Sequence, residues 1–324
     1  MKKALIIGIA GQDGSYLAEH LLEQGYEVTG LLRRNSTPEH QESRIHHLAD
    51  HLKTRYGDLT DQHSLEAAIR ESQPDEIYNL GAQSHVRISY EVPVFTGQVN
   101  AMGVLNLLTA IRNSSPDVRF YQASSSEMFG DSVDDDNFQR ETTPMHPVSP
   151  YGCAKLYGYH ITRNYRKAYG LFAANGILFN HESPRRGSNF VTSKVVKTAC
   201  EIKLGLKKGL ELGNMDSSRD WGHSRDYVRA MVKILGHEKA DDFVIATGQT
   251  HTVRQLVETV FTSLDLDYRD FVTQNPKFLR PEELPYLKGD ASKARQILDW
   301  TPTVTFEELV NEMVTDWMNK LQRG

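Results

Sequence analysis

Short apolar runs alternate with longer amphipathic stretches throughout the first half of the chain. Residues 3–8 lack alternating polar positions, so they predict a strand that is buried on both faces. Residues 16–24 then show the apolar spacing of a helix. Further strand-like runs lie at residues 26–32, 53–57, 76–80, 118–123 and 172–179. The alternation predicts an α/β fold built on a doubly wound parallel sheet, the Rossmann architecture.

The second half of the chain has a different pattern of polar and apolar residues. Residues 180–187 form a polar stretch with Pro and Arg, which predicts a loop, and residues 243–247 are strand-like again. Helical patterns follow at residues 253–264 and 306–321. We therefore expect a smaller, discontinuous C-terminal α/β substrate domain. The predicted division is residues 1–180 and 215–250 for the cofactor-binding Rossmann domain, with 181–214 and 251–324 for the substrate domain.

Composition and charge narrow the class of protein. The 324 residues include 39% hydrophobic and 24% charged side chains, and the formal net charge is -5. This balance favours neither nucleic acid nor an anionic membrane as a partner. The two cysteines, Cys153 and Cys200, form neither a disulfide framework nor a zinc-ligand spacing, so no metal site is expected. Because we find no stretch of about 20 apolar residues, we expect a cytoplasmic enzyme.

Three glycines mark the turn after the first predicted strand. Gly8, Gly11 and Gly14 follow a G-x-x-G-x-x-G spacing, which differs from the commoner G-x-G-x-x-G. Glycines between a strand and a helix let backbone amides approach a pyrophosphate at the helix N-terminus. The position of this motif predicts a dinucleotide site.

The end of the second strand indicates which dinucleotide binds. NAD sites usually carry an acidic residue here, whereas this chain has Arg33, Arg34, Asn35 and Ser36. Guanidinium groups pair well with a 2'-phosphate, so the segment favours NADP. A solvated basic loop would have the same composition.

A tyrosine and a lysine are spaced for one face of a helix. Tyr151 and Lys155 lie four residues apart, after Ser149-Pro150 as a helix start. A nearby lysine is expected to lower the pKa of the phenol, which could then take a proton from a substrate hydroxyl while hydride passes to nicotinamide. A plain helix-surface pair would show the same spacing. The catalytic interpretation gains weight because the strand at 118–123 ends in Ser124-Ser125-Ser126-Glu127, at the sheet edge where such folds place their chemistry.

Taken together, these segments are similar to a known family. The chain resembles the extended short-chain dehydrogenase/reductases and, within them, the GDP-mannose 4,6-dehydratases, over essentially its whole length. The residues that carry the resemblance are GIAGQDGSYL (8–17), YNLGAQSHV (78–86), YQAS (121–124), SPYG (149–152), GILFNHESPRRG (176–187) and RDWGH (219–223).

The resemblance implies a role for each matching residue. Tyr151 and Lys155 match the catalytic pair, Ser125 stands where a threonine is usual, and Glu127 matches the carboxylate that removes the C5 proton. The predicted NADP contacts are Gly8, Gly11, Gln12, Asp13, Gly14, Arg33, Arg34, Ser36, Asp58, Leu59, Leu80, Ala82, Ser84, Tyr151, Lys155, His181 and Arg186. The predicted contacts of GDP-mannose are Ser84, Ser125, Glu127, Asn180, Lys194, Arg219, Arg280 and Glu283.

The implied reaction is a dehydration with no net change of oxidation state. Oxidation at C4 acidifies the proton on C5, Glu127 removes that proton, the C6 hydroxyl leaves as water, and hydride returns to C6. A 4-epimerase needs no such base, so Glu127 argues for dehydration unless it only caps a helix or forms a surface salt bridge. A dehydratase for a different nucleotide sugar and a non-catalytic NADP-binding protein are the competing interpretations of the chain as a whole.

Two further expectations come from the resemblance. Leu284-Pro285 replaces the Val-Asp of many relatives, and Pro285 lacks a backbone donor, so the loop over the nucleotide is expected to differ. In relatives the loop that corresponds to residues 33–43 reaches a neighbouring subunit. The resemblance therefore implies a homotetramer, assembled as a dimer of dimers.

Overall fold

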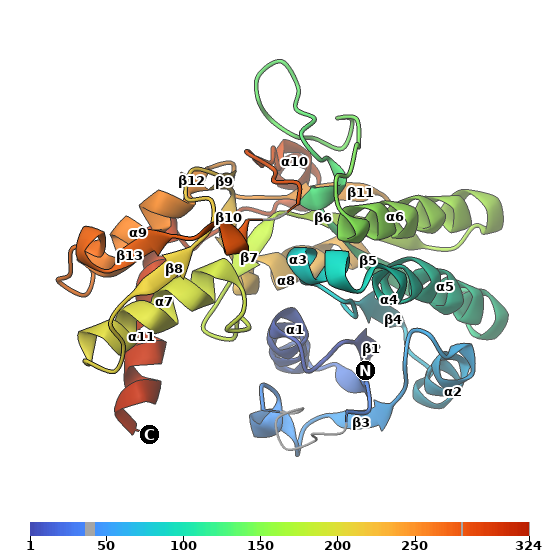
Figure 1. Cartoon of the computed structure of the whole chain (residues 1–324). Coiled ribbons are helices and arrows are strands. Elements are labelled where there is room, and N and C mark those ends of the chain that lie inside the picture. The colour runs from blue at the N-terminus through green and yellow to red at the C-terminus, as the bar shows by residue number, and fades with distance from the viewer. Residues whose placement is uncertain (36–42, 280, 324) are drawn as a thin grey trace.

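A seven-stranded parallel sheet forms the centre of the larger lobe in the computed structural model, which describes residues 1–35, 43–279 and 281–323 (Figure 1). Its strand order is β11-β6-β5-β4-β1-β2-β3, so the order reverses between β1 and β4. The strands are β1 (Lys3–Ile7), β2 (Glu27–Leu32), β3 (Lys53–Tyr56), β4 (Glu76–Asn79), β5 (Arg119–Ser125), β6 (Ala173–Leu178) and β11 (Asp242–Ile245). The predicted fold class is confirmed, including the return of the later chain to the first sheet.

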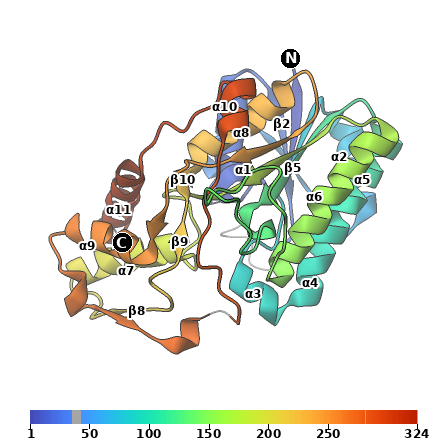
Figure 2. The same cartoon turned by 90° about the horizontal axis from the view of Figure 1, so that it is seen from above.

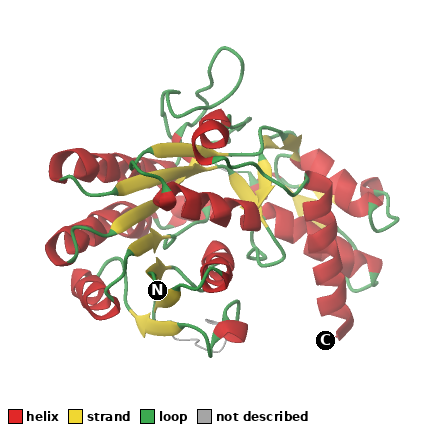
Figure 3. Ribbon diagram, turned by 180° about the vertical axis from the view of Figure 1, so that it is seen from behind, coloured by secondary structure: helices red, strands yellow, loops and turns green. Residues whose placement is uncertain are grey.

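Helices cover both faces of this sheet, as Figure 3 shows. The helices on one face share an apolar core with β1 and β2, and they are α1 (Gln12–Glu23), α8 (Ser224–Gly236) and α10 (Ser292–Leu298). The other face carries α2 (Gln62–Ser72), α5 (Gly103–Ser114) and α6 (Pro150–Tyr169). Strands buried from both sides explain why residues 3–8 show no polar alternation.

A continuous helical stretch precedes β5. It comprises α4 (Pro93–Gly97), a π-helical turn η3 (Gln98–Met102) and α5, preceded by the short α3 (Val86–Glu91). In the described chain, Pro93–Ser114 is one helix that is long and apolar enough to cross a membrane by length and composition alone. Half of its apolar window is buried, and α5 packs against α2 and α6. A core helix of a globular fold has these same properties.

The smaller lobe packs α7 (Val191–Lys203), α9 (Val253–Thr262) and α11 (Phe306–Arg323) around their own apolar cluster (Figure 2). Short strand pairs join its segments. They are β8 (Leu210–Leu212) with β13 (Val272–Gln274), β7 (Asn180–Glu182) with β10 (Trp221–His223), and β9 (Ser218–Arg219) with β12 (His251–Thr252). The expectation of a polar loop over 180–187 was therefore wrong at its start, because β7 pairs in parallel with β10.

The packing divides the chain less simply than the predicted boundaries. Ala294, Leu298 and Trp300 belong to the apolar core shared with α1 and α8, although residues 251–324 were expected in the substrate domain. Conversely, Met215 and Trp221 pack in the smaller lobe's cluster. The division at residue 180 stays a prediction, and we propose that α10 belongs with the large sheet.

Candidate active site

A cavity of about 620 Å³ lies between the carboxyl ends of the parallel strands and the smaller lobe. From the larger lobe it is lined by residues that follow β4, β5 and β6, and from the smaller lobe by α7 and the loop after β8. Open α/β sheets bind ligands at this edge, where the strand order reverses. The cavity is therefore the candidate active site.

The turn between β1 and α1 is closely packed around its glycines. Gly8 has a φ of +84°, and a Cβ added to it would lie 2.9 Å from the amide nitrogen of Gly81. A Cβ on Gly14 would lie 2.3 Å from the carbonyl oxygen of Gly8. The N-cap of α1 is Gly11, which supplies no side-chain hydrogen bond, so the first amides of the helix remain available to a ligand. These features fit the pyrophosphate of a nucleotide cofactor.

Asp13 and His181 form a half-buried pair at the edge of the cavity. The Nε2 atom of His181 lies 2.8 Å from a carboxylate oxygen of Asp13, and the Ser224 hydroxyl donates to the other oxygen at 2.9 Å. Burial works to raise the pKa of Asp13, but the charge and hydrogen bond of His181 outweigh it and lower the pKa to about 2. Burial likewise opposes protonation of His181, yet Asp13 raises its pKa. The pair ties α1 to β7.

The start of α6 places Tyr151 in the cavity. The Ser149 hydroxyl accepts the amide of Gly152 at 3.0 Å, and Pro150 occupies the first helical position, as the sequence predicted. The ammonium nitrogen of Lys155 lies 5.7 Å from the centroid of the Tyr151 ring and donates to the carbonyl oxygen of Ala123 at 2.9 Å. The two side chains thus share one buried helix face.

The protonation of this pair differs from our expectation. Burial raises the pKa of Tyr151 to about 12, against a side-chain hydrogen bond with Ser125 that lowers it. Burial also lowers the pKa of Lys155 to about 8. The expected lowering of the phenol's pKa was wrong for the protein alone, because desolvation outweighs the hydrogen bond with Ser125 and the charge of Arg186, which lower it.

Glu127 lies in the turn that directly follows β5. It belongs to the short helix η4 (Ser126–Met128), and its amide donates to the Ser125 hydroxyl at 3.3 Å. A Cβ on Gly152 would come within 2.8 Å of the Glu127 carbonyl oxygen, so the turn packs directly on α6. Glu127 is 7% exposed and lines the cavity, which contradicts the interpretation as a surface salt bridge.

Most predicted site residues line this cavity together. They are Asp13, Leu80, Ala82, Ser84, Ser125, Glu127, Tyr151, Lys155, Asn180, His181, Arg186, Lys194, Arg219 and Glu283. Ser36 and Arg280 lie outside the described residues, as does most of the loop at 33–43. The contact of each lining residue with a cofactor or substrate stays a prediction.

The remaining predicted cofactor residues lie away from the cavity wall. The Gln12 side chain binds the His181 carbonyl at 3.1 Å and the Ser183 hydroxyl at 2.8 Å, and Leu59 packs in the core beside α5. The Asp58 carboxylate accepts the Thr60 amide at 2.8 Å. These side chains hold local structure, so a cofactor contact there would have to use backbone atoms or the second carboxylate oxygen of Asp58. Arg33 and Arg34 are exposed at the end of β2.

The departure at Leu284-Pro285 fits the structure without strain. Leu284 is 1% exposed and packs with Met128 and Phe129, and the carbonyl oxygen of Pro285 accepts the amide of Ser218 at 2.8 Å. Pro285 has no amide proton to donate, but this pairing uses only its carbonyl oxygen and is therefore unaffected. The neighbouring Arg219 is 6% exposed and lines the cavity.

Sequence reasoning missed several lining residues. Arg87 faces the cavity from α3, one position beyond the segment that carried the resemblance. Phe190 lies 3.6 Å from the Arg186 guanidinium, and Phe278 lies 3.9 Å from the Lys194 ammonium, with both distances measured to the ring centroid. Aromatic residues far from the motifs carry no sequence signal for such a site. Arg87 could have been identified, because it is a cation three residues after the predicted site residue Ser84.

Comparison with known proteins agrees with this geometry. A family model described as GDP-mannose 4,6 dehydratase matches residues 5–313. A GDP-mannose 4,6 dehydratase of Drosophila melanogaster is 49% identical over 97% of this chain and 85% of its own length. A GDP-mannose 4,6-dehydratase of Yersinia enterocolitica is 49% identical over 97% of this chain and 93% of its own length.

A solved structure, that of RMD from Pseudomonas aeruginosa complexed with NADPH, has the same fold. Its TM-score is 0.83 at 22% identity, covering 98% of this chain and 100% of that one. The similarity of the structures supports the fold, and the sequence matches extend over nearly the whole chain. The chain therefore belongs to the GDP-mannose 4,6-dehydratase family.

Proposed function

We propose that the protein converts GDP-α-D-mannose to GDP-4-dehydro-6-deoxy-α-D-mannose and water, as a hydro-lyase of deoxysugar biosynthesis. Membership of the family supports the overall reaction. The observation that carries the assignment within the site is Glu127, a buried carboxylate that lines the same cavity as Tyr151 and Lys155. A 4-epimerase needs no base at C5, so this carboxylate favours dehydration.

Tyr151 and Ser125 would act at the C4 hydroxyl. Their hydrogen bond supports this role, because two bonded oxygens are close enough together to contact one sugar hydroxyl. The high pKa of Tyr151 means that it needs a positive neighbour to lose its own proton and act as the base. Lys155, on the same helix face, is the proposed neighbour, and the charge of Arg186 also lowers this pKa. When bound, nicotinamide supplies reversible hydride transfer, from C4 at the start and to C6 at the end.

Glu127 would act at C5. Oxidation at C4 acidifies the adjacent C5 proton, which the carboxylate removes. The electron pair of the C5–H bond forms the C5–C6 double bond, and the C6 hydroxyl leaves as water with the proton that Glu127 took. When hydride reaches C6, C5 gains a proton in place of the one that Tyr151 took from the C4 hydroxyl, which restores Tyr151. The sum is the loss of one water.

We infer that the nucleotide cofactor is NADP. The uncapped, glycine-lined start of α1 supports binding of the pyrophosphate. Arg33 and Arg34, both exposed at the end of β2, support recognition of a 2'-phosphate.

On the substrate side, Lys194 and Arg219 are the proposed partners of the diphosphate. The ammonium of Lys194 is held by the Glu211 carbonyl oxygen at 2.7 Å, at the cavity edge. Asn180, whose buried Oδ1 atom has no hydrogen-bond partner among the described residues, supports a contact with the sugar. Glu283 is the proposed partner of the guanine edge. Ser84 is proposed to contact both ligands.

Assembly and location stay predictions. Exposed apolar side chains on α4, η3 and α6 support a helical interface between subunits: Val94, Phe95, Met102 and Tyr157. A homotetramer and a cytoplasmic location are proposed on the resemblance to the family.

Mass spectrometry of the sugar nucleotide tests the assignment. Purified protein is incubated with GDP-mannose and catalytic NADP, in parallel with Glu127→Gln and with Glu258→Gln, which alters an exposed carboxylate of α9. We expect wild type and Glu258→Gln to remove one water and Glu127→Gln to lose that activity. An unchanged mass with a C4 epimer as product would establish the epimerase, and no reaction would point to another nucleotide or to a binding protein.

A further inference from the structure

A closed loop separates the two catalytic segments of the chain. It leaves the sheet after Glu127 and returns just before Tyr151, as the green loop above the sheet in Figure 1. Its two ends meet at a neck, where the amide of His146 donates to the Phe129 carbonyl oxygen at 3.2 Å. Gly130 has a φ of +63° at this neck. The neck therefore lies within a few positions of both Glu127 and Tyr151.

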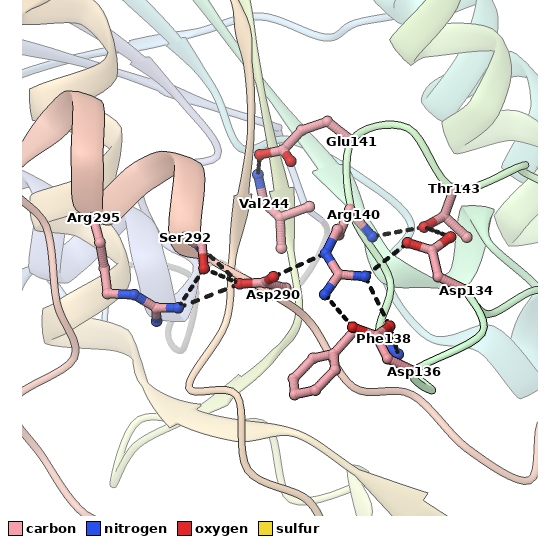
Figure 4. Close-up of polar contacts among 10 residues, drawn as sticks. All are labelled: Asp134, Asp136, Phe138, Arg140, Glu141, Thr143, Val244, Asp290, Ser292 and Arg295. Carbon is pink, nitrogen blue, oxygen red and sulfur yellow. Dashed lines mark hydrogen bonds and ion pairs between the residues drawn. The ribbon is translucent and has the colours of Figure 1, made fainter.

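Arg140 organises the interior of this loop (Figure 4). Its guanidinium pairs with Asp134 at 2.9 Å and with Asp136 at 2.6 Å, both from the same loop. Its Nε atom reaches outside the loop to Asp290, also at 2.9 Å. One side chain thus fastens the loop to itself and to the segment before α10.

That segment, residues 283–290, forms a strap beside the cavity. Its Lys288 carbonyl oxygen accepts the amide of Gln139 at 2.9 Å, and the amide of Asp290 donates to the Gln139 carbonyl at 3.0 Å. Nearer the start of the strap, Leu287 donates its amide to the Ser218 carbonyl at 3.2 Å. The end of the strap at Glu283 lines the cavity.

The strap also touches the turn that carries Glu127. Leu284 and Leu287, 1% and 0% exposed, pack in one apolar cluster with Met128 and Phe129. The two residues after Glu127 are thus held both by the strap and by the neck of the loop. Arg140 joins these two supports through its pair with Asp290, and Lys288 of the strap adds a contact 4.2 Å from the centroid of the Phe138 ring of the loop.

We propose that Arg140 is a positioning residue for Glu127: by fastening the loop to the strap it fixes the carboxylate relative to the C5 proton. The inference rests on the proposed function, because it assigns Glu127 to proton removal. Arg140 is not among the residues that line the cavity, so it acts here through the turn. A displacement of about 1 Å at a reacting group can lower the rate about a hundredfold. A residue that acts on Glu127 only through the turn is therefore able to change the rate of the reaction.

The test compares kinetic isotope effects in Arg140→Gln and wild type. Substrates deuterated at C5 or at C4 are used with the full-length protein. If Glu127 is displaced, proton removal from C5 becomes slower than the other steps. We then expect kcat to fall about tenfold, KM to change less than twofold, and the isotope effect at C5 to rise while that at C4 does not. A loss of folded protein would lower the rate without changing either isotope effect.

Two matched variants complete the test. Arg295→Gln removes another cation that contacts Asp290, at 3.3 Å, but from the side of α10. It should leave kcat and both isotope effects unchanged. Arg140→Lys keeps one charge toward Asp290 and should recover part of kcat. With the rate expressed per folded molecule, a fall in kcat with an unchanged C5 isotope effect, or an unchanged kcat in Arg140→Gln, would overturn the proposal.

Hydrogen exchange separates failure of this inference from failure of the proposed function. Exchange at the amides of residues 127–130 and 286–290 is measured without substrate. Faster exchange of both segments in Arg140→Gln, but not in Arg295→Gln, is expected. If wild type fails to dehydrate GDP-mannose, the proposed function falls, and this measurement alone decides whether Arg140 holds the turn. Unchanged exchange overturns the inference in either case.

Discussion

Burial sets the protonation state of the residues around Tyr151. The phenol has a pKa of about 12 and the neighbouring ammonium of Lys155 has one of about 8, both moved by desolvation. A neutral phenol and a charged lysine are therefore the resting state at neutral pH. The phenol can accept a proton from the substrate only after it has lost its own. Positive charge beside the ring favours that loss, because it stabilises the phenolate.

Replacement of Tyr151 by Phe tests this role at the scale of one atom. Because the hydroxyl is the proposed acid–base group, we expect kcat to fall about 10²- to 10⁴-fold with little change in cofactor affinity. Tyr159→Phe is the matched control, since its hydroxyl lies on the same helix but contacts Asp242 at 3.4 Å. Steady-state kinetics and cofactor titration measure both. Equal rates in Tyr151→Phe and wild type would remove Tyr151 from the mechanism.

The choice of NADP can be tested at Arg33 and Arg34. Loss of a charge-assisted hydrogen bond costs about 1.5–3 kcal/mol, so Arg34→Gln or Arg33→Gln should weaken NADP binding about tenfold to a hundredfold. Affinity for NAD should stay the same, because NAD has no 2'-phosphate. Titration of both cofactors checks this. Arg269→Gln, at an exposed site of the smaller lobe, controls for the lost charge, and a parallel loss for both cofactors would contradict the assignment.

At the scale of elements, the close packing of the β1–α1 turn predicts that a larger side chain there destabilises the protein. Gly14→Ala would place a Cβ 2.3 Å from the Gly8 carbonyl and 2.6 Å from the Ile9 Cα, both backbone atoms that cannot move aside cheaply. We expect a loss of about 1–3 kcal/mol in the free energy of unfolding and weaker cofactor binding. Denaturant unfolding measures it. Gly97→Ala, where nothing lies within 4 Å, should be neutral or slightly stabilising, and equal effects of the two changes would refute the role of close packing.

Asp220 joins several elements behind the cavity. Its carboxylate accepts the Thr247 hydroxyl at 2.6 Å and the amides of Thr247 and Gly248, each at 2.9 Å. Burial nevertheless outweighs these bonds and raises its pKa to about 6. A carboxyl whose pKa is higher in the folded state stabilises the fold at low pH. That contribution is lost as pH rises from the unfolded value toward 6.

Asp220→Asn should remove this pH dependence. The free energy of unfolding of wild type, relative to the variant, should fall by at most about 3 kcal/mol between pH 4 and pH 7, since one pKa unit corresponds to about 1.4 kcal/mol. Hydrogen bonds lost with the substitution shift the difference by a constant and leave its slope unchanged. Urea unfolding at several pH values gives the slope. A difference that does not vary with pH would contradict the raised pKa.

The elements themselves were largely predictable from sequence. A strand buried on both faces, such as β1, shows a continuous apolar run from Ala4 to Ile7, and α6 has its Ser149-Pro150 start. The short β7 was not predictable, because its pairing with β10 joins residues about 40 positions apart and rests on contacts rather than composition. The place of α10 on the large sheet depends on tertiary packing in the same way.

At the scale of the whole molecule, the cavity exists only because two lobes meet. Motifs near the strand ends identified Tyr151 and Glu127, but Arg87 on α3 and Lys194 on α7 come from different lobes. Burial and surrounding cations, including Arg87, lower the pKa of Lys194. Several positive charges that lie close together in a cavity favour the binding of a diphosphate. Spacing along the chain cannot reveal such a pair, because only the arrangement of the lobes brings it together.

The proposed dehydration is internal, because the hydride taken from C4 returns to C6 of the same sugar. GDP-mannose deuterated at C4, incubated with catalytic NADP in ordinary water, tests this transfer when the product is followed by mass spectrometry and nuclear magnetic resonance. We expect a product that has lost one water and carries the deuterium at C6. A product of unchanged mass, inverted at C4, would contradict the mechanism, and so would a dehydrated product from which the deuterium has been lost.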